Sequence, residues 1–472
     1  MTPSRNSKDP YERDHRRKRG KELRKTAPRE SHAEWSPRED RANPISLLQE
    51  QDALRVQYLV PIKYGRMLES AFAFFRGSAA LMAADLQSSP TTGLQAMLCG
   101  DAHLSNFGIF ASPERRMIFD INDFDEAYPG PWEWDLKRLA ASAVIAGRDN
   151  GFEAKQCRRM AVITVDSYRH AMQRFSELST LDVWYFHVST SAVLQAFENL
   201  SKHARKHARE TVEKASRRTQ TRTLEKMTHL EAGRLRFNSE PPLLVPVAEL
   251  DLGTLEVEGD LTAFKVETLY GGWRDYVDSL PDDRKFLLRR YQPVDCALRV
   301  GGVGSVGTRC ATMLLQGEGR DDAILLQLKE AGTSVLEPYM QKASYTSQGE
   351  RVVTGQRLIQ AVGDIFLGWH TSHASEVDYY WRQFKDLKGS AAIDELDGKG
   401  LSTYMKVCAT CLARAHARTG DAAAIAGYIG KGGTLSEAIA DFSVIYAGQA
   451  EDDHQALVQA VKEGRVEAQT GL

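Results

Sequence analysis

Residues 95–111, QAMLCGDAHLSNFGIFA, and residues 117–127, MIFDINDFDEA, decide the fold of this chain. In both stretches an apolar run is followed directly by a dense polar loop. The pattern predicts strand, loop, strand, turn and strand over residues 94–128, with a hairpin turn at residues 112–115. Packing alone does not require polar loops of this density between apolar strands. The loops at 100–108 and 120–126 are therefore candidates for function.

The residue types in these two loops are those that phosphoryl transfer to a hydroxyl group needs. An Asp is followed five residues later by an Asn, and the second strand delivers several carboxylates. One carboxylate orients the attacking hydroxyl and accepts its proton. An amide oxygen and another carboxylate hold Mg²⁺ on the phosphates of a nucleotide.

Two other interpretations of the acidic loop compete with a metal site. A calcium-binding loop starting at Asp120 would place Phe124 at a ligand position, Asp125 where glycine is required and Pro131 where the closing glutamate belongs. That interpretation fails. A solvated acidic turn would not explain the strand before the loop or the helix start after it, so the metal site is favoured.

A second constellation lies about 200 residues further along the chain, where residues 302–307 read GVGSVG. Dinucleotide-binding turns share this motif, but they open a helix. Here an apolar run at 308–315 is joined by a polar loop to a second run that ends at Lys329. The pattern predicts a glycine loop on a β-hairpin, whose backbone covers phosphates while the lysine on the next strand contacts them. The nucleotide-binding residues predicted here are Gly302, Gly304, Ser305, Gly307 and Lys329. A plain glycine turn with a surface lysine is the alternative.

The ammonium group of such a lysine usually needs a carboxylate to hold it. Glu350, near the start of a predicted helix at 348–363, is the first candidate and Glu337 is the second. The sequence does not choose between them.

Three linked motifs carry a resemblance to known families: GDAHLSN at 100–106, NDFDEA at 122–127 and PGPWEWDL at 129–136. They are similar to the GDxHxxN, DFxxA and DLA series of aminoglycoside phosphotransferases, choline kinases and their protein-kinase-like relatives. More closely, residues 45–455 resemble the uncharacterised bacterial domain-of-unknown-function family 2252, which is grouped with the kinase-like fold. The resemblance implies an α+β, two-lobed, protein-kinase-like fold with a site for ATP and Mg²⁺.

By position in these motifs, the resemblance implies that Asp101 is the catalytic base and that Asn106 and Asp123 are metal ligands. Asp135 would hydrogen-bond the backbone of the catalytic loop. One departure is Cys99, which stands where those relatives usually carry a supporting histidine. This change bears on the rigidity of the loop more than on its chemistry.

The order of the two constellations departs from that of kinases, which place the glycine loop before the catalytic aspartate. Either the glycine loop is unrelated, or the lobe order is permuted so that the catalytic loops precede the glycine-rich β lobe; we favour permutation. A permuted fold requires the Lys329 ammonium to lie across one cleft from Asp123, under about 10 Å away, which is the length of a phosphate chain. The glycine loop would roof this cleft, and Asp101 would lie on its floor beside Asn106.

Composition sets limits on the partners of the chain. The 472 residues carry 61 Lys and Arg against 63 Asp and Glu, a net charge of −2, so bulk charge does not require a nucleic acid or an acidic membrane. No apolar run reaches the roughly 18 residues of a membrane-spanning helix, and residues 1–10 lack the apolar core of a secretion signal. Six scattered cysteines are too few for a disulfide framework. We expect a cytoplasmic protein.

Four segments are expected along the chain. They are a disordered basic arm at 1–43, a large helical lobe with the catalytic and metal loops at 44–285, a small β-rich lobe with the glycine loop at 286–395, and C-terminal helices returning to the large lobe at 396–472. The arm has almost no aliphatic side chains, so it cannot bury enough surface to offset its chain entropy. Within the large lobe, residues 132–236 are expected to be helical.

Two groups of basic residues are open to more than one interpretation. Residues 201–236 hold 11 Lys and Arg against 4 Asp and Glu. A solvated helical face is favoured, and an electrostatic rim that attracts an anionic substrate is the alternative. Four basic residues flank the acidic loops in sequence: Arg66, Arg76, Lys137 and Arg138. They either balance the charge of those loops or clamp an anionic substrate, and we favour the first.

Together these observations predict an ATP- and Mg²⁺-dependent phosphotransferase that acts on a hydroxyl group of an unknown small-molecule or protein acceptor. The alternatives are a catalytically silent nucleotide-binding scaffold or sensor, and an enzyme that transfers the nucleotidyl instead of the phosphoryl group. Nucleic acids and membranes are not expected as partners. The pocket that selects the acceptor is built from loops that carry no signature in the sequence.

Overall fold

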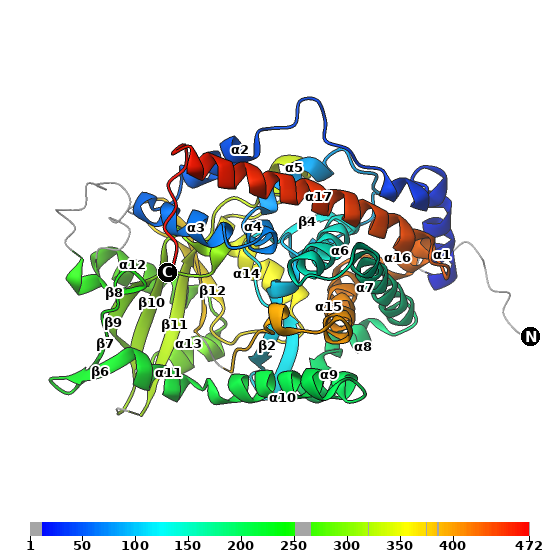
Figure 1. Ribbon diagram of the computed structural model, residues 1–472. Coiled ribbons are helices and arrows are strands. Elements are labelled where there is room, and N and C mark those ends of the chain that lie inside the picture. The colour runs from blue at the N-terminus through cyan, green and yellow to red at the C-terminus, as the bar shows by residue number, and fades with distance from the viewer. Residues whose placement is uncertain (1–11, 251–265, 320, 374, 385–386, 472) are drawn as a thin grey trace, which may run out of the picture.

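The computed structural model describes residues 12–250, 266–319, 321–373, 375–384 and 387–471 (Figure 1). The fold is mixed α+β, as the sequence predicts, with several antiparallel sheets and a larger set of helices. In Figure 1 the largest sheet stands on the left, most of the long helices lie on the right, and α17 runs along the top of the molecule.

The largest sheet has six strands in the order β12, β13, β11, β10, β9, β8, and each strand runs antiparallel to its neighbours. Its strands are β8 (Leu244–Pro246), β9 (Gln292–Arg299), β10 (Cys310–Gln316), β11 (Ala323–Glu330), β12 (Gly368–Thr371) and β13 (Asp378–Gln383). The strands β10 and β11 are buried almost throughout, because their apolar runs face a core on both sides of the sheet.

Different elements cover the two faces of this sheet. Met313 and Leu315 point to the face covered by α12 (Val266–Asp278) and α13 (Asp282–Leu288). Leu314 points to the opposite face, where it packs with side chains of α11 (Gln220–Met227) and β7 (Arg234–Phe237). The period-two alternation of strand side chains therefore feeds two separate apolar clusters.

The strand pattern predicted for residues 94–128 is confirmed. β1 (Gln95–Leu98) pairs with β4 (Tyr128–Pro131), and β2 (Phe107–Ala111) pairs with β3 (Met117–Ile121), which also pairs with β5 (Val188–Ser189). The turn between β2 and β3 is closed by hydrogen bonds between Ser112 and Arg115 and between Ser112 and Arg116. Since β1 and β4 lie side by side, the two polar loops between them are held within one closed segment.

The helical body packs around α6, which is buried along nearly its whole length. Its members contact one another: α6 (Trp132–Asp149), α7 (Ala154–Phe175), α15 (Gly398–Thr419), α16 (Ala422–Ile429) and α17 (Thr434–Lys462). Their apolar side chains form one continuous core with β1, β2 and β3. The helices at the end of the chain thus pack on the helices that follow the two polar loops.

Shorter helices surround this body and the sheet. Before the first strand come α2 (Pro44–Asp52), α3 (Val60–Met67), α4 (Ala71–Arg76) and α5 (Ala79–Leu86). After α7 come α8 (Thr180–Tyr185), α9 (Thr190–Phe197), α10 (Lys202–Arg217) and α11, and α14 (Gln348–Ile359) follows the sheet strand β11. Figure 1 shows α10 along the lower edge, bridging the sheet side and the helical side of the molecule.

The prediction of a disordered arm over residues 1–43 is wrong for residues 12–43, and residues 1–11 lie outside the described residues. Residues 13–22 form helix α1 (Arg13–Glu22), which packs on α16. The helices approach closely at Gly20, where an added Cβ would lie 1.9 Å from the Ala424 carbonyl oxygen. Arg24 donates to the carbonyl oxygens of Tyr428 and Gly427 at 2.8 and 2.6 Å. Hydrogen bonds from arginine side chains to the last carbonyls of α16 hold the segment in place. A prediction of disorder from low apolar content does not count such bonds.

Two predicted boundaries also differ from the structure. The sheet begins at β8, and α12 and α13 pack on it, so the β-rich unit takes in residues that the sequence assigned to the large helical lobe before 286. Residues 228–237 form the hairpin β6 (Thr228–Glu231) and β7 instead of continuing the helices. The hairpin forms because Leu235 and Phe237 alternate into the sheet's apolar cluster.

Within the described residues, every helix is too short or too polar to cross a membrane. All six cysteines are free thiols, in agreement with the expectation of no disulfide framework.

Candidate functional site

The first polar loop is fixed by a buried carboxylate on α6. Asp135 accepts hydrogen bonds from the backbone N–H groups of Cys99 and Gly100 at 2.8 and 3.0 Å, the role that the family resemblance implied for it. Gly100 has a φ of +80°. A Cβ at this position would lie 2.2 Å from the Glu126 carbonyl oxygen, so glycine lets the two polar loops touch. The start of the Asp101 loop is thereby held rigidly against the acidic loop.

Asn106 joins the Asp101 loop to the acidic loop. Its amide nitrogen donates to the backbone carbonyls of Asp101 and Asp123 at 3.0 and 3.2 Å. Its amide oxygen accepts from the backbone N–H of Asp123 at 2.7 Å. The oxygen keeps a second lone pair, so this bond does not prevent it from ligating a metal. Asn106 therefore sets the distance between Asp101, the candidate base, and Asp123, the candidate metal ligand.

Asp101 is paired with a buried arginine. The Arg138 side chain on α6 donates to Asp101 Oδ1 at 2.6 Å from Nε, and His103 Nε2 lies 3.5 Å from Oδ2. Burial favours the protonated acid, but the Arg138 guanidinium and His103 outweigh it and hold the pKa of Asp101 below its usual range. Asp101 is therefore an ionised carboxylate with a fixed direction.

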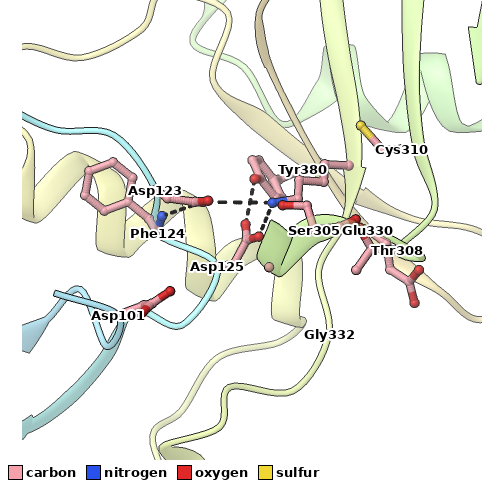
Figure 2. Close-up of polar contacts among 12 residues, drawn as sticks. Asp101, Asp123, Phe124, Asp125, Ser305, Thr308, Cys310, Glu330, Gly332 and Tyr380 are labelled. Carbon is pink, nitrogen blue, oxygen red and sulfur yellow. Dashed lines mark hydrogen bonds and ion pairs between the residues drawn. The ribbon is translucent and has the colours of Figure 1, made fainter. Parts of the chain in front are cut away.

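The acidic loop meets Lys329, which ends the buried part of β11. The Lys329 ammonium pairs with Asp125 and lies 3.9 Å from Asp123 Oδ1. The distance to Asp123 is within the limit of about 10 Å that a permuted fold requires. Tyr380 on β13 donates its hydroxyl to the other oxygen of Asp125 at 2.7 Å. Figure 2 shows Asp123, Asp125 and Tyr380 converging, with Asp101 on a separate loop.

The pKa values of the two carboxylates in the acidic loop shift in opposite directions. Withdrawal from water inside the cleft and the neighbouring charge of Asp125 raise the pKa of Asp123. For Asp125 the ammonium of Lys329 outweighs burial and lowers the pKa. Burial acts against the charged lysine, but the two carboxylates outweigh it and raise the pKa of Lys329. Asp123 is thus the carboxylate with the stronger need for a further cation.

The glycine loop connects β9 and β10, two antiparallel strands, as predicted. Lys329 on β11 stands opposite Cys310, the first residue of β10, so the lysine lies just below the loop. Among the described residues, the backbone N–H groups of Gly302, Val303 and Gly304 have no hydrogen-bond acceptor. Three unpaired N–H groups on one short loop form an arrangement that suits the oxygens of a phosphate.

One cavity of about 280 Å³ collects the predicted residues from both constellations. The residues from the sequence prediction in its lining are Asp101, Asn106, Asp123, Gly302, Gly304, Ser305 and Lys329. Gly307 lies at the end of the loop, where its φ is +87° and its Cα faces Arg55. Segments about 200 residues apart in sequence therefore build one site.

The prediction that Glu350 pairs with Lys329 is wrong. Its carboxylate accepts from the backbone N–H and the hydroxyl of Thr346 at 2.7 and 2.6 Å and caps the start of α14. The second candidate, Glu337, accepts from Gln348 at 3.2 Å. Asp125 takes the place of both, because it follows Asp123 on the loop that faces β11.

Of the cations that line the cavity, the sequence pointed to Arg76 and Lys329 but missed the others. Its lining includes Arg76, Arg299, Arg382 and Lys388 besides Lys329, against the two carboxylates Asp101 and Asp123. Arg382 stands two residues after Tyr380 on β13 and so points to the same face of the sheet, a signal that the period of a strand could have given. Withdrawal from water and the nearby Arg382 lower the pKa of Lys388 to about 7. A site with this excess of cations suits an anionic ligand.

The donors around Asp123 fit a magnesium ion. Mg²⁺ takes oxygen ligands and is commonly held by one or two protein oxygens together with substrate phosphates. Asp123 and the amide oxygen of Asn106 supply two such oxygens, and the side-chain oxygen of Asn122, in the same cavity, is buried without a partner among the described residues. No three His, Cys, Asp or Glu side chains in the described ranges gather into a metal site of their own. Phosphate oxygens would therefore have to complete the shell.

The fold and this site define an α+β protein with a cation-rich cleft between a glycine hairpin and two carboxylate loops. The chain belongs to the family described as uncharacterized protein conserved in bacteria (DUF2252), whose model matches residues 55–460. Neither the search of curated proteins nor the search of solved structures found a match.

Proposed function

We propose that the protein is an ATP- and Mg²⁺-dependent phosphotransferase of kinase-like fold with permuted lobe order. The observation that carries the proposal is the shared cavity. The Lys329 ammonium lies 3.9 Å from Asp123, and the glycine loop lines the same space as Asp101 and Asn106. Chance rarely brings together the separate parts of a phosphoryl-transfer site from segments so far apart in a chain.

In this proposal the nucleotide phosphates bind between the glycine loop and the acidic loop. The unpaired N–H groups of Gly302 to Gly304 cover the phosphate oxygens, and Lys329 and Arg382 contact them from β11 and β13. Asp123 and Asn106 would hold Mg²⁺, which when bound neutralises charge on the phosphates. The pairing of Lys329 with Asp125 keeps the ammonium extended toward the phosphate position before the nucleotide arrives.

Asp101 would act on the acceptor. Its carboxylate accepts a hydrogen bond from the acceptor hydroxyl and aims the oxygen at the γ-phosphorus. The new bond joins that oxygen to phosphorus, the bond from phosphorus to the β–γ bridging oxygen breaks, and ADP leaves. The hydroxyl proton passes to Asp101 and then to water. Because Arg138 keeps the pKa of Asp101 low, the carboxylate contributes mainly orientation and takes the proton late, which suits a loose transition state.

A catalytically silent nucleotide-binding protein is the second candidate. The ion pair with Arg138, with a contact of 2.5 Å, favours it, because it occupies the carboxylate that catalysis would use. Transfer of the nucleotidyl group is a variant of the first candidate that uses the same cleft.

The test compares turnover in the wild type and in Asp101→Asn, using ATP labelled on the α- or the γ-phosphate and a cell extract as the source of acceptors. We expect label from the γ-phosphate in a product, and a rate about 10²- to 10⁴-fold lower in Asp101→Asn at matched nucleotide occupancy. Transfer of the α-label would replace phosphoryl by nucleotidyl transfer. Equal rates of ATP consumption in the two proteins would contradict the proposed phosphotransferase activity.

A further inference from the structure

A second cavity, of about 640 Å³, opens beside the cleft. We call it the basic groove. Its wall is built from the end of α10, from α11, from β8 and from the strand end and loop at 299–302. Six cationic side chains line it, against the single acid Glu240: Arg66, Arg217, Arg218, Arg222, Lys226 and Arg299.

The charges of Arg222 and Lys226 in the basic groove are not explained by pairing among the described residues. In the described part of the chain, the side chains of Arg222 and Lys226 have no hydrogen-bond or ion-pair partner. Arg217 lies 3.8 Å from Glu213 with most of its side chain exposed, and the Arg218 side chain donates to the Lys388 carbonyl at 3.3 Å. Arg222 and Lys226 stand one helical turn apart, and like charges at this spacing destabilise a helix. An anion bound between Arg222 and Lys226 would attract both side chains and offset their mutual repulsion.

The basic groove adjoins the cleft. Arg299, Gly301 and Gly302 line both cavities, so the start of the glycine loop separates them. Arg66 donates to the Gly301 carbonyl and braces this wall from α3. A molecule lying in the groove therefore borders the place where Gly302 would meet a phosphate.

The lining favours a small molecule over a nucleic acid. The apolar side chains in the groove are aliphatic or thioether: Met227, Leu243, Leu244 and Val300. Among the described residues, no aromatic ring that could stack on a base lines the groove, whereas single-stranded nucleic acids usually bind on such rings. The volume falls in the range of small-molecule sites, about 300–1,000 Å³.

We infer that the basic groove binds the acceptor, and that the acceptor is a small organic molecule carrying two or more phosphate or carboxylate groups. The acceptor role rests on the proposed phosphotransferase function, whereas the anion site does not. The anionic groups lie on Arg217, Arg218, Arg222 and Lys226, and the remainder of the molecule extends past Gly301 and Gly302 toward Asp101.

The experiment measures binding of inositol hexakisphosphate by calorimetry to the full chain. This probe is a compact organic polyanion whose bulk suits the larger cavity. The groove variant is Arg222→Gln with Lys226→Gln, and the matched control is Lys202→Gln with Lys206→Gln, which removes the same charge from the exposed face of α10 outside the groove. We expect the affinity to fall at least tenfold in the groove variant and to stay within twofold in the control. We also expect MgATP to bind both variants with wild-type affinity within twofold.

Three results would overturn the inference: no binding of the probe to the wild type, equal losses in the groove and control variants, or a parallel loss of MgATP affinity in the groove variant. The last result would make the groove part of the nucleotide site. If the probe binds through the groove while MgATP does not bind at all, the anion site stands and the proposed function fails. The two proposals are therefore tested separately.

Discussion

Lys329 and Asp125 form the contact that joins the sheet to the carboxylate loops. The ammonium side chain is 2% exposed, so its charge has few partners other than Asp125 and Asp123. A buried ion pair contributes little net stability, but loss of one partner leaves an uncompensated charge and costs about 3–5 kcal/mol. The stability of the chain should therefore depend on the pair as a unit.

This dependence can be measured by a double-mutant cycle. We expect Lys329→Met to lower the free energy of unfolding by about 3 kcal/mol or more, and Asp125→Asn combined with Lys329→Met to recover part of that loss, because the double variant no longer holds the charge of Asp125 without its partner. Urea unfolding of the two single variants and the double variant measures the coupling. Costs that simply add would show that the two side chains do not depend on each other.

Part of the candidate site could be predicted from the sequence. Asp101, Asn106, Asp123 and Lys329 were found because they stand at fixed places in short motifs. The partner of Lys329 was not found, because it depends on which loop faces β11 across about 200 residues. Within the acidic run, nothing in the sequence distinguishes Asp125 as the residue that takes this role.

At the scale of elements, the glycine loop contains glycines of two kinds. Gly307 has a φ of +87° and contacts Arg55, so the fold itself requires it. Gly302 has a φ of −72°, and an added Cβ would meet no atom within 4 Å. The fold does not require glycine there, yet the position faces both cavities. This contrast points to a ligand that approaches the backbone at Gly302.

The two positions therefore give a matched pair of variants. We expect Gly307→Ala to lower the free energy of unfolding by about 1–2 kcal/mol, since alanine is strained at positive φ. We expect Gly302→Ala to keep wild-type stability but to weaken MgATP binding at least tenfold, because the methyl group occupies the place of a phosphate. Thermal unfolding and calorimetry check the two effects. Wild-type MgATP affinity in Gly302→Ala would contradict the placement of the phosphates.

A different element, the segment that follows α1, gives a pH-dependent contribution to stability. His32 is fully buried and its Nε2 lies 2.7 Å from the Tyr428 hydroxyl of α16. Burial and the nearby Lys137 lower the pKa of His32 to about 3. The unfolded chain binds a proton below about pH 6.5 while the folded chain does not, so acid favours unfolding between these two values.

We therefore expect the unfolding free energy of the wild type to fall more steeply than that of His32→Gln as the pH is lowered from 6.5 to 4. The difference in slope should approach about 1.4 kcal/mol per pH unit, the value for one proton. Urea unfolding at several pH values measures both slopes. Parallel slopes would mean that His32 does not stay neutral in the folded protein.

The same segment shows why element-scale predictions failed where they did. The rule that links low apolar content to disorder counts side-chain burial. It does not count arginines that satisfy the last carbonyls of a distant helix, as Arg24 does at α16. In contrast, the hairpins around Ser112 and the glycine loop were predicted, because local turn chemistry determines them.

At the scale of the whole molecule, the near-neutral charge conceals a strong local separation. The net charge of −2 gives no sign of a site for small anionic ligands. The cleft and the basic groove nevertheless contain nine cationic side chains besides Lys329: Arg66, Arg76, Arg217, Arg218, Arg222, Lys226, Arg299, Arg382 and Lys388. An average over the sequence cannot show which surfaces the fold brings together. The two cavities instead define a surface that suits two anionic molecules lying side by side.

We propose that one cleft, built from two separate parts of the matched family region, binds MgATP. The most direct measurement is calorimetric titration of ATP, with and without Mg²⁺, into the wild type and into Asp123→Asn, an isosteric change that keeps an acceptor for the Phe124 N–H. We expect sub-millimolar MgATP binding by the wild type and at least tenfold weaker binding both without Mg²⁺ and in Asp123→Asn. No binding up to millimolar MgATP, or equal affinities in the two proteins, would contradict it.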